Sequence, residues 1–463
     1  MASTRRPRAR QSHCATAAGF ESRFGGYRSG IATVTVGTTR RGLPPGPSSG
    51  RFAQAAAFHR DPLGFLRGVR AEFGDTFTVR LAVSGPMVVF TDRAVVDEIA
   101  EIPREVGHAG AARRRIVQMI SERSVLGADS DDHRVRRERL EPAFAADIFD
   151  ERRDEMMRIA ESHLTGWPTG RPFRVLPRMR RIVDDIFVRL ALGVRDEKRA
   201  QALAAATYRM LWTPGNPPVS PPGRYAGVLG AAGKLVFDRR KAPAVRLLSD
   251  EIEAQRAGVK EPHGVIGAMV RATPGKPTDE LVDELLPLLM AGQEPPAAGL
   301  TWILDRLARN PELAEHFLSS PPDDPLRTAT VREALRLRPA VHSVARRLSE
   351  PRVIGGYELP AGMTANVPIV LLHRDPVAFR EPDEFRPERF LERDVDRLAF
   401  LPFGGGPRVC LGRWLARAEI GTVIPAILRA LELKPLSREP ERMVVRGTVV
   451  VPQRGELAVA RAR

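Results

Sequence analysis

Alternating apolar and polar positions mark two short strands near the start of the folded part of the chain. Residues 76–83 and 87–90 show this period-two pattern, and Ser84-Gly85-Pro86 between them predicts a turn. The dipeptide Thr91-Asp92 then predicts the cap of a short helix that ends near Ala100. The chain is therefore expected to open with a strand–turn–strand unit followed by a helix.

Helical spacing of apolar residues dominates the middle of the chain. The pattern is mainly helical from about residue 131 to residue 318, with a proline-rich loop at 214–223. Residues 358–367 predict short strands, and a last helix is expected to begin near residue 410 and to end near residue 431. No repeat occurs at the periods typical of solenoids. These patterns predict a fold that is mainly α with a small β-rich part.

The longest predicted helix runs from Thr278 to about Asn310. Acidic residues crowd its first turns, where the helix dipole favours negative charge. Prolines at 287, 295 and 296 remove backbone donors from its interior. The helix is therefore expected to be interrupted rather than regular along its length.

Composition fits a globular protein, except at the amino end. The chain has 463 residues, of which 43% are hydrophobic, and this permits a sizeable core. The net charge is +16, and the first 41 residues, with eight arginines and one glutamate, carry +7 of it. A turn-rich segment at 42–47 follows. We expect a basic, disordered tail at residues 1–41, for which a targeting role stays open, and a single folded domain at residues 42–463.

Charge and cysteine usage narrow the class of protein. Basic and acidic residues are interleaved beyond the tail, and no basic helix with base-reading side chains stands out, which argues against nucleic-acid binding. An acidic protein partner suits a moderately basic face better. The two cysteines, Cys14 and Cys410, give no disulfide framework, and no apolar run is long enough to span a membrane. The sequence therefore predicts a soluble, cytoplasmic protein.

The segment from Phe403 to Gly412, FGGGPRVCLG, carries the strongest chemical signal. Its glycines allow positive φ angles and a close approach to a flat ring. Backbone N–H groups and the positive end of the following helix favour the thiolate form of Cys410. Arg408 can reach an acidic substituent of a bound cofactor, and Phe403 can shield the sulfur. A buried thiolate of this kind is an electron-rich axial ligand for haem iron that favours O–O cleavage.

Two other interpretations of this segment are weaker. A plain glycine turn before a helix would make Cys410 a small core residue. A phosphate-binding loop would require a Lys-Ser or Lys-Thr pair after the glycines, and this sequence has none there. The haem-thiolate interpretation uses every fixed position, since the pattern F-x-x-G-x-x-x-C-x-G is complete. It predicts iron bound by the sulfur of Cys410.

This segment resembles the signature of the cytochrome P450 family, and the resemblance extends over nearly the whole chain from about Gly42. Glu333-Ala334-Leu335-Arg336 is similar to the family's E-x-x-R, and the segment 385–390 is similar to its P-E-R-F element. The resemblance implies the cytochrome P450 fold of the bacterial type, with haem b, iron protoporphyrin IX, as cofactor. It also implies a structural network beneath the cofactor, formed by Glu333, Arg336 and Arg389.

Further matches concern the carboxylates of the haem. His133 and Arg137 are four residues apart on a predicted helix and match the family's His-x-x-x-Arg pattern, so both can face one anionic group. Arg346 matches a third carboxylate partner, and Arg408 matches a fourth. The resemblance thus implies a cofactor-binding set with these members: His133, Arg137, Arg346, Phe403, Arg408, Cys410 and Gly412.

The long helix departs from the family pattern (Ala/Gly)-Gly-x-(Asp/Glu)-Thr. The chain has Ala291, Gly292, Glu294 and Pro295 here, so the small residues and the acid are present while proline replaces the threonine alcohol. Pro295 and the following Pro296 cannot donate to the carbonyls of Ala291 and Gly292, which are expected to be open and to attract ordered water. One hypothesis is that a water chain on these carbonyls and Glu294 replaces the alcohol.

Three functions stay open at this point. The first is a monooxygenase that oxidises a lipophilic or mixed small organic molecule with O2. Its electrons are expected from a separate ferredoxin and ferredoxin reductase, since no flavin or nicotinamide domain is expected. The second is a peroxide-driven or radical-coupling, cyclising or desaturating variant, in which weakened proton delivery is part of the mechanism. The third is a non-catalytic haem or ligand binder. Ordinary hydroxylation with a neutral proline is a further alternative, and a role in specialised metabolism is expected.

The same resemblance assigns the substrate wall and the partner surface. The wall is expected from three segments with apolar side chains of the long helix added: residues 101–125, 208–229 and 341–344, with Leu289, Met290 and Ala291. The run Arg113-Arg114-Arg115 can grip an acidic substrate, although such a run is more often solvated. Three arginines on the helix of His133 are expected to dock an acidic ferredoxin-type donor: Arg134, Arg136 and Arg139.

Overall fold

The structure is a computed structural model that describes residues 40–117, 119–211, 228–258 and 263–463. The predicted proline-rich loop at 214–223 lies outside these residues, and so does the predicted basic tail up to residue 39. The backbone N–H of Arg40 donates to the carbonyl of Gly356 at 2.9 Å. The described fold therefore includes the last two residues of the predicted tail.

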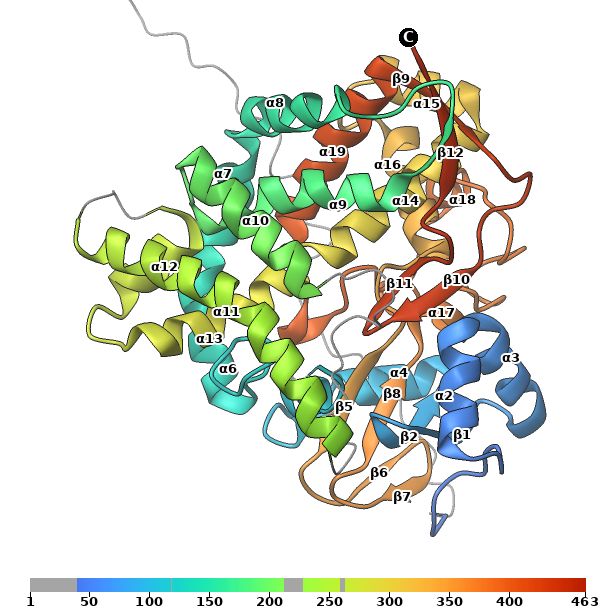
Figure 1. Ribbon diagram of the computed structural model, residues 1–463. Helices are drawn as coiled ribbons and strands as arrows, with labels where there is room; N and C mark the ends of the chain where they lie inside the picture. Colours follow the sequence, from blue (N-terminus) through green and yellow to red (C-terminus); the bar gives the residue numbers. More distant parts are fainter. Residues whose placement is uncertain (1–39, 118, 212–227, 259–262) are drawn as a thin grey trace, which may run out of the picture. The chain divides into compact units, whose positions relative to one another are not determined.

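A five-stranded sheet forms the centre of the β-rich part (Figure 1). Its strand order is β1-β2-β8-β5-β3, with the bounds Thr76–Leu81, Gly85–Phe90, Thr364–Val367, Val344–Leu348 and Gly107–His108. Strand β2 pairs antiparallel with β1 and parallel with β8. Helices α2 (Arg51–Arg60) and α3 (Pro62–Phe73) pack against β1. The predicted strand–turn–strand unit is confirmed, although β2 already begins at Gly85, inside the predicted turn.

Helix α4 (Arg93–Ala100) follows β2, as predicted, and its cap is the predicted aspartate. The side chain of Asp92 accepts a hydrogen bond from the N–H of Ala94 at 2.9 Å, which satisfies a donor of the first turn. Three smaller sheets complete the β structure. They are β4-β12-β9 (Pro172–Arg174, Leu457–Ala462, Leu431–Pro435), β10-β11 (Met443–Arg446, Val449–Pro452) and β6-β7 (Arg352–Ile354, Tyr357–Leu359).

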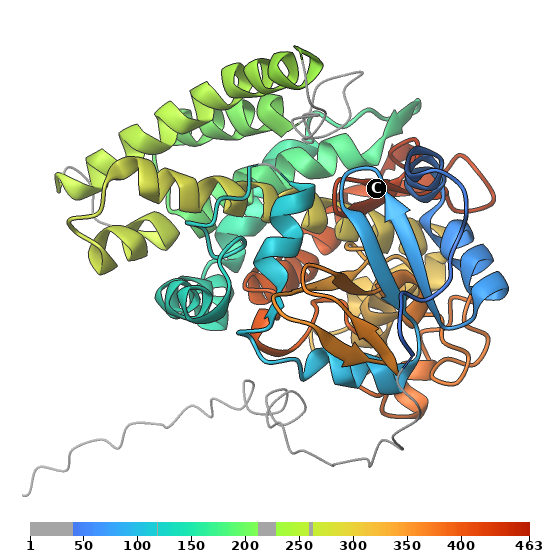
Figure 2. The same cartoon turned by 90° about the horizontal axis from the view of Figure 1, so that it is seen from below.

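Helices build the larger part of the molecule, and α10 and α11 lie side by side along one edge of it (Figure 2). Besides the two helices of the next paragraph, the bounds are α5 Ala109–Ile116, α6 Ser130–Leu140, α7 Ala146–Asp150, α8 Arg153–Leu164, α9 Val175–Ile186, α10 Glu197–Leu211, α11 Val228–Arg256, α12 Gly264–Ala272, α15 Pro311–Ser319, α16 Pro325–Leu337, α17 Ile369–Leu372, α18 Arg389–Glu392 and α19 Arg413–Ala430. A π-helical turn, Phe187–Leu192, continues α9. The predicted fold class, mainly α with a small β-rich part, is confirmed.

The long predicted helix is two helices, α13 (Thr278–Ala291) and α14 (Glu294–Arg309), separated by Gly292 and Gln293. Pro295 and Pro296 occupy the first turn of α14. The N–H groups of a first turn have no acceptor within the helix, so proline costs little there. The predicted interruption is confirmed, and it falls on the segment that departs from the family pattern.

Helix α14 is the centre of the core. It packs against α9, α16 and α19, and most of its side chains are buried (Figure 1). The indole N–H of Trp302, a fully buried side chain, donates to the carbonyl of Val450 in β11 at 3.3 Å. This contact joins the helical core to the β-rich part. The core thereby fixes α14, which begins at Glu294, and α19, which follows Cys410.

Candidate functional site

Cys410 lies in the loop that joins a short 3₁₀ turn, Gly406–Arg408, to helix α19. Its backbone N–H donates to the carbonyl of Phe403 at 2.9 Å, which closes the loop. Gly404 and Gly406 have φ angles of +71° and +61°, a conformation that glycine adopts without steric cost. The predicted glycine-dependent turn and the helix that follows it are confirmed.

The thiol of Cys410 lies in a mixed electrostatic environment. Its side chain retains accessible surface, yet burial among protein atoms raises its pKa above the ordinary value. The backbone N–H of Gly412 and the charges of Arg137, Arg413 and Arg113 lower that pKa. Donors and cations that favour a thiolate thus already surround the sulfur.

Five basic side chains, which we call the cation cluster, lie together beside the cysteine loop: Arg113, His133, Arg137, Arg346 and Arg408. Burial, then the charges of Arg408, Arg137 and Arg113, lower the pKa of His133 to about 3. Burial and the charge of Arg113 lower the pKa of Arg408 to about 9, with smaller contributions from Arg346 and Arg137 and against the effect of Asp129. The four arginines of the cluster therefore outnumber the carboxylate of Asp129, beside a neutral His133, and the cluster suits a ligand with carboxylates, such as haem b.

Arg408 is only partly satisfied by the protein. Its Nη2 donates to the carbonyl of Ala128 at 2.8 Å and to Oδ1 of Asp129 at 2.7 Å. Its Nη1 is buried and has no hydrogen-bond partner in the described part of the chain. A buried guanidinium nitrogen without an acceptor is costly. This atom therefore fits the binding of an anionic ligand group.

The other predicted carboxylate partners have their own protein contacts. Arg137 Nη1 donates to the carbonyl of Val409 at 2.7 Å, so Arg137 braces the cysteine loop directly. His133 is buried on α6. Arg346 lies on β5, where it donates to the carbonyl of Ala345 at 3.1 Å. The structure thus brings together the residues that the family pattern assigned to the haem carboxylates.

Arg113 belongs to the cation cluster, although the sequence analysis gave it no cofactor role. It lies on α5, and its Nη1 donates to the carbonyl of Leu126 at 3.3 Å. Burial lowers its pKa, and the charges of Asp129 and Cys410 raise it. The flanking Arg114 and Arg115 make the run look like a solvated face. Only the packing of one side of α5 distinguishes Arg113, and one sequence does not show that packing.

Glu333, Arg336 and Arg389 form the buried network that their motifs predicted. Arg336 donates to both carboxylate oxygens of Glu333, at 2.7 and 2.8 Å, and Arg389 Nε donates to Glu333 Oε1 at 3.0 Å. Arg336 also donates to three backbone carbonyls, those of His373, Pro382 and Glu384. The side chains of Glu333 and Arg336 are fully buried. Unlike Arg408, both guanidinium groups of this network have acceptors for their buried nitrogens.

His373 links this network to the segment that leads into the cysteine loop. Its Nε2 accepts a hydrogen bond from the N–H of Leu401 at 2.8 Å, so Nδ1 carries the proton and donates to the carbonyl of Arg336 at 3.3 Å. Burial and the charges of Arg336 and Arg374 lower the pKa of His373 to about 3, so the ring is neutral. The network thereby positions the chain just before Phe403.

Glu294, the acid of the interrupted helix, is held by an arginine that the sequence analysis missed. Arg180 of α9 donates from Nε to Oε2 at 2.8 Å and from Nη2 to Oε1 at 2.6 Å. The two side chains are 6% and 5% exposed. Burial raises the pKa of Glu294, while Arg180 opposes this. No signal in the sequence connects the two positions, which are 114 residues apart.

A second buried acid, Asp184, lies one turn beyond Arg180 on α9. Burial and the charge of Glu294 raise its pKa well above the ordinary value, and Arg180 opposes this. Asp184 is therefore a weaker acid than an exposed aspartate, and it interacts with the acid of the interrupted helix.

The small residues of the departing segment lie around the break between α13 and α14. A Cβ on Gly292 would lie 2.1 Å from the ring of Phe187, so only glycine allows this approach to the π-helical turn. Ala291 and Pro295 are partly exposed. No backbone N–H in the described segments donates to the carbonyl of Ala291 or Gly292. This agrees with the open carbonyls expected from the two prolines.

The arginines of α6 are less available to a partner than the sequence suggested. Arg136 is 13% exposed and pairs with Asp132 at 3.0 Å and with Glu284 at 3.2 Å. Arg134 pairs with two acids of its own helix. Arg136 is therefore partly covered and already paired, and its docking of a partner stays a prediction. Arg139 is exposed.

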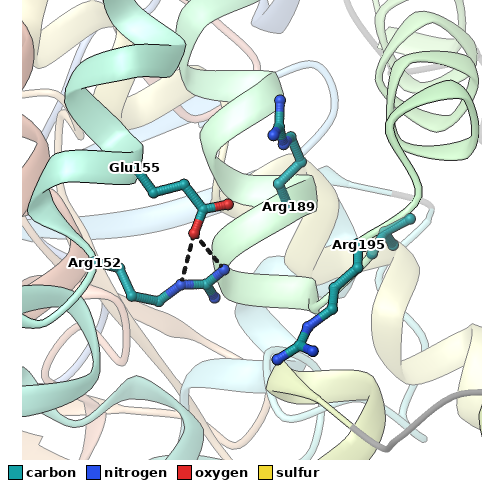
Figure 3. A pocket seen from close by; sticks show the side chains of 5 residues that line it. Arg152, Glu155, Arg189 and Arg195 are labelled. Carbon is teal, nitrogen blue, oxygen red and sulfur yellow. Dashed lines mark hydrogen bonds and ion pairs between the residues drawn. The ribbon is translucent and has the colours of Figure 1, made fainter.

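A separate pocket of about 470 Å³ opens beside α8 and the π-helical turn (Figure 3). It is lined by Arg152, Glu155, Arg189, Val194 and Arg195. Arg152 donates to Glu155 at 2.8 and 3.2 Å, whereas the side chains of Arg189 and Arg195 point in different directions (Figure 3). These basic groups do not converge on one ligand position, so the pocket is no part of the candidate site.

Among the residues that the structure describes, no helix is both long enough and apolar enough to cross a membrane. The same residues contain no group of three or more His, Cys, Asp or Glu side chains arranged to hold a metal ion. Cys410 is a free cysteine.

Comparisons with known proteins agree on one family. The family model for cytochrome P450 matches residues 323–459. Putative cytochrome P450 135B1 of Mycobacterium tuberculosis is 32% identical over 447 residues, which cover 92% of this chain and 93% of that protein. Putative cytochrome P450 135A1 of the same species is also 32% identical, over 90% of this chain and 95% of the relative.

Solved structures share the fold. Retinoic-acid-bound cyanobacterial CYP120A1 has a TM-score of 0.74 at 20% identity and covers 93% of this chain and 100% of its own. CYP175A1 from Thermus thermophilus has a TM-score of 0.69 at 23% identity, with coverages of 89% and 97%.

Fold, relatives and cysteine loop together define the class as a haem-thiolate oxidoreductase. The chain belongs to the cytochrome P450 family, whose members are monooxygenases that bind haem b through a cysteine thiolate.

Proposed function

We propose that this chain oxidises a lipophilic or mixed small organic molecule with O2, and that Cys410 is the ligand of its haem iron. One observation carries the proposal. Cys410 lies beside a cation cluster in which Arg408 Nη1 is buried without a protein acceptor. An iron macrocycle with carboxylates satisfies both features at once, because the sulfur binds the metal and the cations bind the carboxylates. When bound, the haem supplies O2 activation.

The residues around the sulfur have distinct tasks in this proposal. Arg408, His133 and Arg346 bind the haem carboxylates, and we assign Arg113 to the same task because its charge acts on Arg408. Arg137 supports the loop through the carbonyl of Val409. Phe403 shields the sulfur, and the N–H of Gly412 is directed at it. Glu333, Arg336 and Arg389 hold the scaffold and take no part in the chemistry.

Proton supply depends on Glu294 and the groups beside it. Arg180 holds both oxygens of Glu294 toward α9. Burial and the charge of Glu294 raise the pKa of the neighbouring Asp184. When Arg180 moves away from Glu294, the acid can take up a proton and pass it on. Water on the open carbonyls of Ala291 and Gly292 would carry it further, in place of the missing threonine hydroxyl.

The same segment favours a second candidate function. Without an alcohol at position 295, and with Glu294 bound by Arg180, proton delivery is weak. Weak delivery suits a peroxide-driven enzyme, or one in which a substrate radical couples, cyclises or loses hydrogen. Pro295→Thr restores the alcohol. If the fraction of electrons used for product and the product itself stay unchanged in this variant, the special-chemistry alternative fails.

The substrate wall and the electron donor are further parts of the proposal. Helix α5, Val344 at the start of β5, and Met290 belong to the segments from which the wall is expected. Most of the third expected segment, 208–229, is outside the described residues. Electrons come from a separate ferredoxin and its reductase, which are attracted by exposed cations such as Arg139.

Turnover with two oxidant systems separates the candidate functions. A screen of lipophilic compounds for a shift of the haem absorption band first selects a substrate. Product with O2, ferredoxin and reductase supports the monooxygenase. Product with hydrogen peroxide alone, at a higher rate, supports the second candidate. If neither system gives product while the spectral shift remains, the chain is a non-catalytic haem-containing binder.

A further inference from the structure

One carboxylate, that of Asp129, connects helix α5 to the cysteine loop. Its Oδ1 accepts a hydrogen bond from the N–H of Gly110, and its Oδ2 accepts one from the N–H of Ala111, both at 2.7 Å. Asp129 thus caps α5 from outside that helix. Its Oδ1 also accepts from Arg408 Nη2 at 2.7 Å. The side chain is only 10% exposed, so these contacts form away from bulk water.

Further contacts fix α5 to the segment that precedes Asp129. Arg113 donates to the carbonyl of Leu126 at 3.3 Å, and Arg114 donates to the carbonyl of Gly127. A Cβ on Gly110 would lie 2.2 Å from that same Gly127 oxygen, so the two backbones are in direct contact. Helix α5 cannot move away from residues 126–129 without loss of several of these bonds.

Arg408 is attached to the same segment from the other side. Its Nη2 binds both the carbonyl of Ala128 and the carboxylate of Asp129, while its Nη1 is the buried nitrogen that lacks a protein acceptor. The residue after Asp129, Ser130, has a φ of +51°, a strained conformation outside glycine. The backbone is thus held in a costly shape at the point where it presents the carboxylate.

We infer that Asp129 is a positioning residue that couples helix α5 to the grip of Arg408 on the haem carboxylate. The inference rests on the proposed function, because Arg408 Nη1 must face that carboxylate. Helix α5 belongs to the expected substrate wall, so a displacement of α5 reaches Arg408 through Asp129. The coupling is reciprocal, as any linkage between two sites must be.

Two measurements on the haem-loaded full chain test the coupling. Amide hydrogen exchange at residues 109–112 reports on α5. Transfer of hemin to apomyoglobin reports on the carboxylate grip. Asp129→Asn is expected to accelerate both by about tenfold, since each charged hydrogen bond is lost or weakened. Asp131→Asn, which changes an exposed acid two residues away, is the matched control and is expected to change neither.

Arg408→Lys tests the same coupling from the side of the cysteine loop, at a residue outside α5. Lysine keeps the charge but cannot reach Ala128, Asp129 and a ligand carboxylate together. We expect it to accelerate α5 exchange by several-fold in the wild-type background and to add no further acceleration to Asp129→Asn. The single Arg408→Lys variant can still be measured if Asp129→Asn fails to fold. In that case Asp129→Glu, with the charge kept and the reach altered, replaces it.

The possible results are distinct. Faster α5 exchange with unchanged hemin transfer in Asp129→Asn would make Asp129 a helix cap only and overturn the coupling. Additive effects of the two substitutions would also overturn it. If the wild-type chain shows no thiolate signature with carbon monoxide, the proposed function fails first, independently of every Asp129 variant.

Discussion

Two groups of arginines in this fold differ in whether the protein supplies acceptors for all their buried guanidinium nitrogens. In the network of Glu333, Arg336 and Arg389, carboxylate and carbonyl oxygens accept from both guanidinium groups. In the cation cluster, Arg408 has a buried nitrogen without an acceptor, and like charges help to depress its pKa. The first group is complete within the protein, whereas the second requires an anionic ligand. The two groups therefore differ in how far protein acceptors satisfy their buried nitrogens, although both are built from arginines.

Removal of the acid from the complete network should have the largest effect. Glu333→Gln leaves Arg336 and Arg389 buried without their carboxylate, and this is expected to cost roughly 3–5 kcal/mol of unfolding free energy. Urea unfolding followed by circular dichroism measures the loss. Glu388→Gln, at an exposed position beside Arg389, is the control and should be neutral. A Glu333→Gln chain as stable as the wild type would refute the scaffold role.

In the cation cluster, a substitution is expected to weaken haem binding rather than the stability of the fold. Arg408→Gln removes a cation that the protein itself does not fully pair, so the secondary structure should persist. Hemin transfer to apomyoglobin should become about 10–100-fold faster, because a charged hydrogen bond to the ligand is lost. Arg139→Gln, exposed on α6, should leave the transfer rate unchanged. Unchanged transfer in Arg408→Gln would remove this residue from the cofactor site.

The Arg180–Glu294 pair, beside the interrupted helix, allows a test of whether a buried acid needs its cation. Arg180→Gln leaves Glu294 buried without a cation, and the pKa of Glu294 should rise further, since Arg180 now lowers it. A raised carboxyl pKa stabilises the fold at low pH, and this contribution is lost as the pH rises through the folded-state pKa. The variant should therefore lose about 1–3 kcal/mol more at pH 8 than at pH 5.

Urea midpoints at the two pH values measure this difference, with Arg181→Gln, an exposed neighbour on α9, as control. An equal loss at both pH values would show that Glu294 does not need the cation.

The buried carboxyl of Glu456, which lies near two further acids, should give the smallest effect. Burial and the charges of Asp305 and Glu441 raise the pKa of Glu456 to about 8, although Arg309 opposes them. Because this value lies above the ordinary 4.5, the contribution to stability is complete below pH 4.5 and is lost as the pH rises through about 8. We expect the melting temperature to fall by about 2–4 °C between pH 6 and pH 9. Glu456→Gln should remove that part of the fall, and an unchanged pH profile in the variant would contradict the assignment.

Local patterns predicted the parts of the fold that depend on local chemistry. The capping aspartate at position 92, the glycine turn before Cys410 and the break at Pro295 follow from backbone conformation and missing donors, which a single sequence displays. The network of Glu333 was also predictable, because its members stand in recognisable motifs.

Partnerships between distant segments outside such motifs could not be predicted. Arg180 and Glu294 meet because α9 packs on α14, and nothing in either segment specifies the other. The sequence alone does not distinguish Arg113 from Arg114 and Arg115, because its place in the cation cluster depends on the packing of α5 against residues 126–129. The same limit explains why the ion pair of Arg136 with Glu284 of α13 was not predicted.

Iron ligation by Cys410 is tested most directly by the absorption spectrum of the reduced, carbon-monoxide-treated protein after loading with hemin. The wild-type chain and Cys14→Ala should both show the red-shifted Soret band of a carbon-monoxide complex with a thiolate ligand. Cys410→Ala should lose that band. A wild-type spectrum without it, or a Cys410→Ala spectrum that retains it, would contradict thiolate ligation at this position.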